Sequence, residues 1–149
     1  MMALKERLQE DWKQALKAGD KLKASTISMA RSAILLVEKT EGRKLDDNEI
    51  IEILAKEVKQ RREAMLEFKK GNRQDLVETA QSEIEILLSY LPQQLTEEEI
   101  TEFVCQAINK VGANSIKDMG KVMAIVVPEL KGRADGKLVS EIVKRNLNN

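Results

Sequence analysis

The sequence contains no histidine and only one cysteine, and these two shortages exclude several classes of chemistry. Without histidine, a serine–histidine nucleophile, a histidine general base and a histidine metal ligand are impossible. Zinc sites built from cysteine and histidine are excluded as well. The single cysteine, Cys105, cannot form a disulfide within the chain, which is typical of a reducing compartment. We therefore expect a cytoplasmic protein without a metal site or a cofactor.

Aromatic residues and long apolar runs are also scarce. One Trp, one Tyr and two Phe are too few for a platform on which nucleic-acid bases stack. The longest apolar run, Val122–Val127, is too short to cross a bilayer, and no run of signal-peptide length follows Lys5 and Arg7. We expect neither membrane association nor a secretory leader. The 25 basic and 25 acidic residues argue against a nonspecific nucleic-acid binder but allow a local basic patch.

Helix-forming residues dominate, and glycine and proline are few, at seven and two. Apolar residues recur at helical spacing along seven stretches, and no stretch has the alternation of a strand. The sequence therefore predicts an all-α fold. Gly19, Gly42 and Gly112 suit left-handed helix ends, and Asp46 and Thr96 each begin a capping box with a glutamate three residues on.

Leu91-Pro92-Gln93-Gln94 is the predicted domain boundary, because the residue before a proline disfavours helix and no apolar stripe crosses this segment. We expect an N-terminal four-helix domain at 1–92 and a small three-helix tail domain at 96–149. The tail domain is near the size at which a lone core becomes marginal. A helix beginning at Ser115 should carry Pro128 inside its pattern, where proline kinks or loosens a helix.

Several residues outside the main apolar stripes also carry predictions of burial. Ile27, Leu35 and Leu36 lie off the main stripe of the second helix and make it apolar on two sides, which is typical of a central helix. Ala124 and Ile125 are expected to pack against a third helix, with a contact to the other unit as the second choice. Cys105 is expected to be a small, partly buried residue rather than a nucleophile, because no histidine is present to activate it.

The segment Lys131-Gly132-Arg133-Ala134-Asp135-Gly136-Lys137, here called the basic turn, carries the most functional information. It gathers three cations and two glycines between two helices, and a helix N-terminus attracts anions, so one interpretation is a phosphate-binding turn. The other is purely structural: Gly132 ends one helix, Asp135 caps the next, and the cations are solvated. A nucleotide loop is disfavoured, because three residues rather than four separate the glycines and Leu138 stands where Ser or Thr would hold magnesium.

A second basic stretch on the third predicted helix has an ordinary interpretation. It comprises Lys56, Lys59, Arg61, Arg62, Lys69, Lys70 and Arg73. Glu52 and Glu57 stand four residues before Lys56 and Arg61, and Glu67 stands three residues before Lys70, as in the ion pairs of an exposed helix. The alternative is a side patch that touches a nucleic-acid backbone.

Over its whole length, the sequence resembles the YqeY family. The resemblance is carried by Lys59-Gln60-Arg61, by Leu87-Leu88-Ser89-Tyr90-Leu91-Pro92, by Lys117-Asp118-Met119-Gly120-Lys121-Val122-Met123 with Pro128, and by Lys131 to Val139. It implies an all-helical fold with a small mobile tail. The family's C-terminal part is similar to the tail of the B subunit of the tRNA-dependent amidotransferase, which amidates glutamate or aspartate mischarged on tRNA. In that enzyme the tail touches the body of the tRNA, and Gly120–Met123 and Lys131–Ala134 correspond to its motifs.

The resemblance implies a tRNA-binding or amidotransferase-related accessory protein whose partners are tRNA and a tRNA-modifying or aminoacylation-related enzyme. The RNA-binding residues would be Lys131, Gly132, Arg133, Gly136 and Lys137, helped by Lys121 and Lys117. The family is also described as a carbon–nitrogen ligase with glutamine as amido donor. The first alternative is therefore that the protein has this ligase activity as part of a larger complex, because no self-sufficient catalytic site is recognisable here. The second alternative is a protein-interaction module that docks a partner on its terminal helices or on Val122–Val127.

Overall fold

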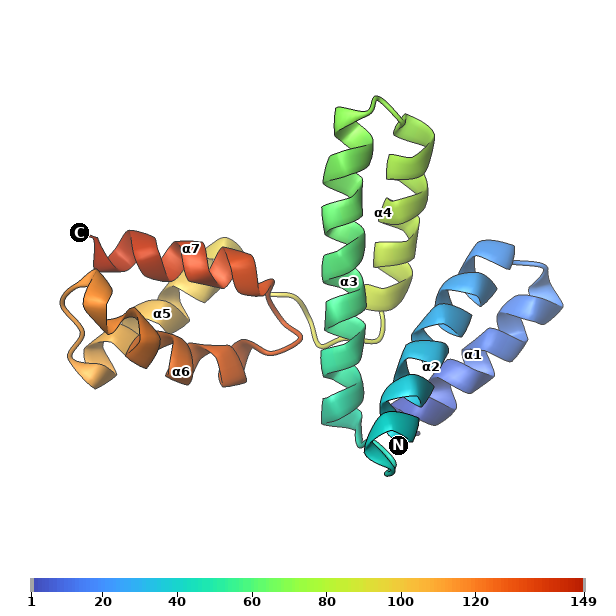
Figure 1. The fold of residues 1–149 in the computed structure, drawn as a ribbon, viewed down its shortest axis with the longest axis horizontal. Coiled ribbons are helices and arrows are strands. Elements are labelled where there is room, and N and C mark those ends of the chain that lie inside the picture. The colour runs from blue at the N-terminus through green and yellow to red at the C-terminus, as the bar shows by residue number, and fades with distance from the viewer. Residues whose placement is uncertain (1, 149) are drawn as a thin grey trace. The chain divides into compact units, whose positions relative to one another are not determined.

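The computed structural model describes residues 2–148, and over these residues the protein is all-α, with seven α-helices and no strand (Figure 1). The predicted fold class is confirmed. The helices are α1 (Leu4–Ala18), α2 (Lys21–Glu41), α3 (Asp47–Lys70), α4 (Gln74–Leu88), α5 (Glu97–Val111), α6 (Met119–Leu130) and α7 (Gly136–Leu147), with a 3₁₀ turn, η1 (Ile116–Asp118), before α6. The chain forms two compact units, the N-terminal unit Met1–Pro92 and the C-terminal unit Gln93–Asn149.

The helix ends follow the local signals in the sequence. Gly19, Gly42 and Gly112 adopt φ values of 74°, 68° and 67°, the left-handed region that glycine enters without steric cost. The capping boxes at Asp46 and Thr96 are both formed, each with the glutamate three residues on. Because these caps satisfy backbone groups at the ends of the helices, the ends are fixed before any tertiary contact is considered.

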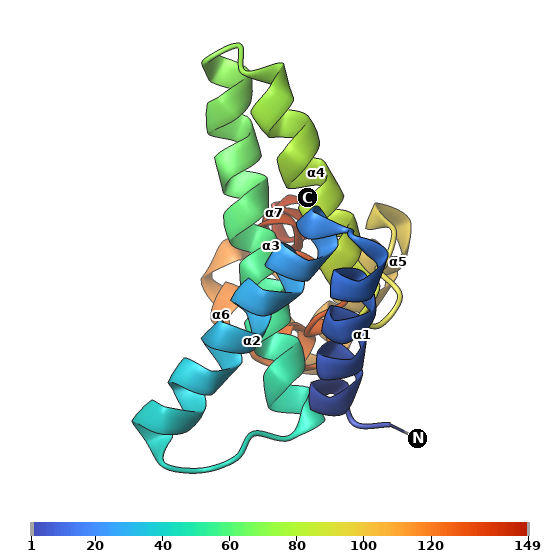
Figure 2. The ribbon, with the colours of Figure 1, turned by 90° about the vertical axis from the view of Figure 1, so that its right-hand side faces the viewer.

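The N-terminal unit pairs its helices into two hairpins, with α1 beside α2 and α3 beside α4 (Figures 1 and 2). Its core is formed by Leu8, Ile27, Ala30, Ile34, Ile50, Leu54, Ile84 and Leu87 among others. Burial of each large apolar side chain contributes about 1.5–3 kcal/mol. The end of α4 is tied to α1: the Tyr90 hydroxyl donates to Asp11 over 2.5 Å, and the Arg7 guanidinium lies 4.6 Å from the Tyr90 ring centroid.

The outer side of α2 is more exposed than predicted. Ile27 is fully buried, but Leu35 and Leu36 are 49% and 66% exposed, so the second helix is not buried on two sides. The physical reason is that the neighbouring helices cover only the face of α2 that carries Ile27 and Ile34, and Leu36 lies on the opposite face. Helical spacing predicts which residues share a face but not how many faces are covered.

The C-terminal unit packs α5, α6 and α7 around a second core. Its members include Ile100, Val104, Ala107, Val122, Val126, Leu130, Val139, Ile142 and Val143. The helix predicted from Ser115 begins later, because Ser115 makes no cap bond and η1 precedes α6. Pro128 lies inside α6. Ala124 is exposed rather than packed, whereas Ile125 is partly buried against the core. Among the described residues, no helix combines the length and the apolar content needed to span a bilayer.

Candidate nucleic-acid interface

The basic turn links α6 to α7 through two local backbone features. After α6 ends at Leu130, the Arg133 N–H donates to the Leu130 carbonyl over 2.9 Å, and Gly132 adopts φ of 74°. Asp135 then caps α7, and its carboxylate accepts from the Lys137 N–H over 3.3 Å. Both features of the structural interpretation, the helix-ending glycine and the capping aspartate, are therefore present.

The turn is held in place by the segment that leads into α5. The Gln94 side-chain amide donates to the Gly132 carbonyl over 2.6 Å, and the Leu95 N–H donates to the Arg133 carbonyl over 2.8 Å. Ala134 packs on the core of the C-terminal unit. These contacts fix the backbone of the turn, so its side chains project from a defined frame.

The three cations of the turn differ in their surroundings. Lys131 and Lys137 are exposed, and Arg133 is half-buried. Arg133 lies near Glu99, whose carboxyl pKa is lowered mainly by hydrogen bonds from Thr96, with a smaller contribution from the Arg133 charge. Part of the Arg133 charge is thus balanced within the fold, and the side chains of the two lysines are exposed.

The N-terminus of α7 is a weaker anion site than the bare helix dipole suggests. Asp135 already accepts the Lys137 N–H and places a negative charge at the helix start. A phosphate at this position would meet that carboxylate. The side chains of Lys131, Arg133 and Lys137 are therefore the stronger candidates for phosphate contacts than the backbone amides of α7.

Lys117 and Lys121 lie in η1 and in the first turn of α6, at the other end of α6 from the basic turn. The 12 residues of α6 span about 18 Å at 1.5 Å per residue. Lys121 lies 3.9 Å from Asp118, a long and exposed ion pair that contributes little to stability. The predicted site residues thus form two groups, one at the turn and one at the start of α6, which cannot hold the same phosphate.

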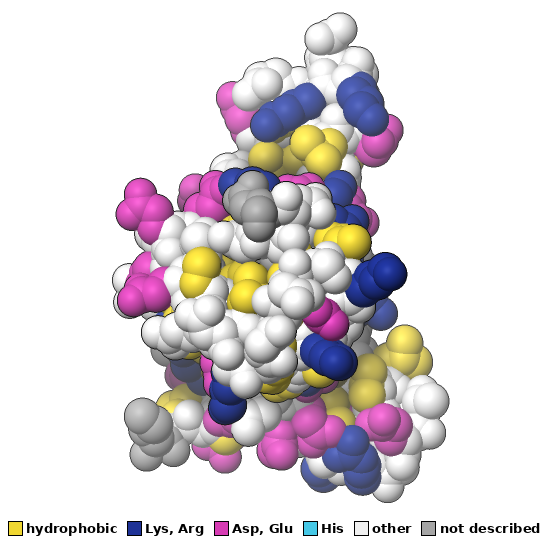
Figure 3. Space-filling model, turned by 90° about the vertical axis from the view of Figure 1, so that its left-hand side faces the viewer, with side chains coloured by type: hydrophobic (Ala, Val, Ile, Leu, Met, Phe, Trp, Pro, Cys, Tyr) yellow, Lys and Arg dark blue, Asp and Glu magenta, His cyan; other side chains and the backbone are white. Residues whose placement is uncertain are grey.

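Charges of both signs are interspersed over the face of the molecule turned to the viewer in Figure 3. This face has no broad area of one sign, which agrees with the formal net charge of zero. On the side shown, attraction for RNA must come from local groups rather than from a broad charged area.

Part of the basic stretch on α3 is engaged in ion pairs. Two of the predicted pairs are present, with Arg61 3.1 Å from Glu57 and Lys70 3.4 Å from Glu67. Arg61 also lies 3.0 Å from Glu83 on α4, and its side chain is only 11% exposed. The α4 partner could not be found from helical spacing, because it comes from packing of the two helices. The interpretation of α3 as an ordinary charged helix surface is favoured.

Cys105 is exposed, so the prediction that it is partly buried is wrong. It lies on the outer side of α5, where its sulfur is 3.7 Å from the Asn146 side-chain oxygen of α7, whereas the adjacent Val104 faces the core. Among residues 2–148, no three side chains of the metal-binding types His, Cys, Asp and Glu are close enough together to hold an ion.

The two glycines of the basic turn are expected to respond oppositely to substitution by alanine. Gly132→Ala should lower the free energy of unfolding of the C-terminal unit by about 1–2 kcal/mol, because a side chain is strained at φ of 74°. Gly136→Ala should be neutral or stabilising by up to about 1 kcal/mol, because Gly136 is helical and an added Cβ meets no atom within 4 Å. Urea unfolding followed by NMR signals of α5–α7 measures both, and equal effects would contradict the prediction.

Comparison with known proteins identifies relatives along nearly the whole chain. A protein of Pyrenophora tritici-repentis named altered inheritance of mitochondria protein 41, mitochondrial, is 30% identical over 141 residues, which cover 93% of this chain and 77% of the relative. The protein of the same name from Lachancea thermotolerans is 40% identical over 87 residues, or 58% of this chain and 46% of the relative. The names of these fungal proteins place them in mitochondria, so the predicted cytoplasmic location is not shared by them.

A second, shorter similarity is to a subunit of a tRNA-dependent amidotransferase. The E subunit of glutamyl-tRNA(Gln) amidotransferase from Thermococcus gammatolerans is 40% identical over 60 residues, which cover 40% of this chain but only 10% of that protein. This agrees with the similarity to an amidotransferase subunit that the sequence motifs imply. The family model described as Yqey-like protein matches residues 5–147. Because that match covers almost the entire chain, the protein belongs to the family of Yqey-like proteins.

Proposed function

We propose that this protein is a non-catalytic tRNA-binding accessory protein whose C-terminal unit contacts the phosphates of tRNA. The observation that carries the proposal is the 40% identity over 60 residues to a component of glutamyl-tRNA(Gln) amidotransferase. The exposed lysines of the basic turn, held on a fixed backbone, support it physically. The small fraction of that component covered here, 10%, agrees with an accessory role rather than with the whole enzyme's activity.

Two contact points are proposed, one at each end of α6. Lys131, Arg133 and Lys137 hold one phosphate, and the conformations of Gly132 and Gly136 set the path of the backbone between them. Lys121, helped by Lys117 four residues earlier, holds a second phosphate, because about 14 Å of helix separates Lys121 from the turn. Contacts of this kind position an RNA without reading its sequence. Discrimination between tRNAs would therefore come from a partner enzyme.

The proposed partner is a tRNA-modifying or aminoacylation-related enzyme that supplies the chemistry. The chain itself contains no histidine, and its single cysteine is exposed on a helix beside a neutral asparagine. The proposal requires only a reducing compartment that contains tRNA, a condition that both the cytoplasm and the mitochondrial matrix meet. Glutamine hydrolysis or aminoacyl-tRNA amidation by the purified protein would replace this proposal with the ligase alternative.

The test is fluorescence anisotropy of labelled tRNA across a salt series, comparing the native protein with Arg133→Glu/Lys137→Glu. The variant should bind at least about tenfold more weakly, and its affinity should fall less steeply with salt, because fewer counterions are displaced. Circular dichroism should show unchanged helicity. The matched control is Lys59→Glu/Lys69→Glu, which makes the same charge change on exposed positions of α3 and should bind like the native protein.

Three outcomes would overturn the proposal or redirect it. Absence of binding at low salt by the native protein removes the RNA contact altogether. Equal weakening by the α3 control moves the contact to the basic stretch on that helix. The docking alternative would be favoured by a protein complex that is insensitive to salt and persists when the charges of the basic turn are reversed. The observation that supports this alternative is Val127 on α6, which is 45% exposed.

A further inference from the structure

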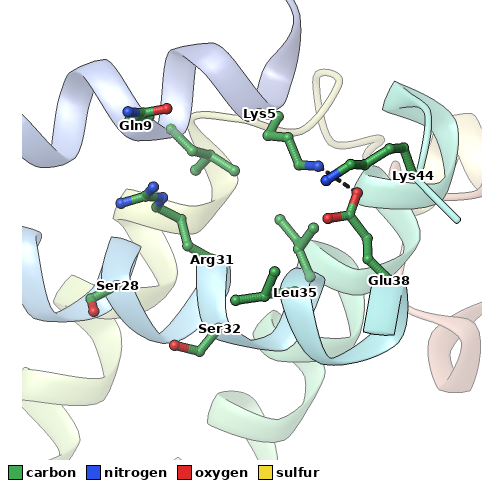
Figure 4. A pocket seen from close by; sticks show the side chains of 10 residues that line it. Lys5, Gln9, Ser28, Arg31, Ser32, Leu35, Glu38 and Lys44 are labelled. Atoms are coloured by element: carbon green, nitrogen blue, oxygen red, sulfur yellow. Dashed lines mark hydrogen bonds and ion pairs between the residues drawn. The ribbon is translucent and has the colours of Figure 1, made fainter. Parts of the chain in front are cut away.

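The N-terminal unit contains a pocket of about 440 Å³ between α1 and α2, within the size range of small-molecule sites (Figure 4). It is lined by the cations Lys5, Arg31 and Lys44, the carboxylate of Glu38, and the hydroxyls of Ser28 and Ser32, among others. These residues come from three segments: α1, α2 and the loop that precedes α3. The pocket is independent of the basic turn and of the proposed contact with tRNA.

Glu38 is the unusual residue of this pocket, because it is a carboxylate with only 6% of its surface exposed. One oxygen, Oε2, accepts from the Leu45 N–H over 3.0 Å and from the Lys5 ammonium. The other oxygen, Oε1, is buried and has no hydrogen-bond partner among the described residues. Figure 4 shows this second oxygen turned toward the pocket, away from the dashed contact with Lys5.

An unsatisfied buried carboxylate oxygen is costly, so it indicates a missing donor. The hydrogen bond from Lys5 is the main cause that lowers the pKa of Glu38, followed by the Leu45 N–H. The group is therefore ionised at neutral pH and can only accept hydrogen bonds. A ligand in the pocket would need to offer an N–H or O–H group to Oε1.

The cations around Glu38 give the pocket a net positive charge. Lys5, Arg31 and Lys44 contribute three positive charges against the single carboxylate of Glu38. The Arg31 guanidinium lies 5.0 Å from the centroid of the Trp12 ring, and this stacking holds the side chain at the wall of the pocket. Figure 4 shows the Arg31 head group and Glu38 on different sides of the pocket, so an anion and a donor can be accommodated in one molecule.

We propose that this pocket binds a small organic anion that also carries an amino or hydroxyl donor. Its carboxylate or phosphate is held by Arg31, and its donor group binds Oε1 of Glu38 on the other side of the pocket. A molecule with both groups satisfies the buried oxygen and the excess positive charge together. A molecule that has the anionic group alone leaves Oε1 unpaired.

Two pairs of probes test this with the full chain by calorimetry. The phosphate pair is O-phosphoethanolamine and ethyl phosphate, and the carboxylate pair is β-alanine and propionate; only the first member of each pair has an amino donor. That member is expected to bind at least about tenfold more tightly, as a charge-assisted hydrogen bond implies. The pair that binds more strongly identifies the anionic group.

Variants locate the binding in the pocket. Arg31→Gln should lower the affinity for the tighter-binding probe at least about tenfold. Lys39→Gln changes an exposed position of the same helix outside the pocket and should leave this affinity unchanged. Glu38→Gln should reduce the preference for the donor-bearing member, with circular dichroism confirming that the unit remains folded. The proposal is overturned if no probe binds at millimolar concentration, if both members of each pair bind equally, or if Arg31→Gln and Lys39→Gln behave alike.

Discussion

Val126→Asp is expected to unfold the C-terminal unit and to leave α1–α4 folded. Val126 is 1% exposed and packs in the core that α5, α6 and α7 share. An aspartate at this position has no partner, and an uncompensated buried charge costs roughly 3–5 kcal/mol. A domain as short as Gln93–Asn149 has a total stability of only a few kcal/mol. Two-dimensional NMR should show the signals of this unit collapsing to those of an unfolded chain.

The control is Val127→Asp, the same substitution at the next residue, which is 45% exposed. It should change the free energy of unfolding by no more than about 1 kcal/mol, because the carboxylate remains in water. The basic turn depends on this core, since Ala134 packs on it, so Val126→Asp should also remove binding to tRNA. Simultaneous loss of the α1–α4 signals would contradict the independence of the two units, and similar behaviour of the two variants would contradict the assigned faces of α6.

The helices and most of their ends could be predicted because their signals are local. A glycine in the left-handed region or an aspartate that caps an amide acts within one turn of chain, so Gly132 and Asp135 define the basic turn already in the sequence. Ser115 is the exception, since Asp118 accepts from the Asn114 N–H and a 3₁₀ turn precedes α6. The separation of Lys117 and Lys121 from the turn also follows from the length of one helix.

Features that depend on which helices meet could not be predicted. The carbonyl of Gly132 is held by Gln94, which is 38 residues away, and Arg61 is held by Glu83 of another helix. The exposure of Leu36 is decided by how many neighbours α2 has. The pocket in the N-terminal unit was the least predictable feature. Its cations come from three segments, and the spacing of residues in the sequence does not indicate that these segments meet.

Leu54→Ala is expected to destabilise the N-terminal unit by about 2–5 kcal/mol. Leu54 is fully buried on α3 within the core of that unit, so its truncation removes apolar contacts and leaves a cavity. Trp12 is the single tryptophan of the chain and packs against the same core, so its fluorescence reports on this unit alone. The midpoint of urea unfolding followed by this signal should fall, with little change in the slope of the transition.

The matched control is Leu66→Ala, which is the same substitution on the same helix at a position 54% exposed. It should change the free energy of unfolding by no more than about 0.5 kcal/mol, because its side chain is largely in water already. Equal losses for the two variants would mean that Leu66 is covered in solution by a surface that the single chain does not provide. A smaller loss for Leu54→Ala than for Leu66→Ala would contradict the placement of the core, since the cavity term exists only where the side chain is enclosed.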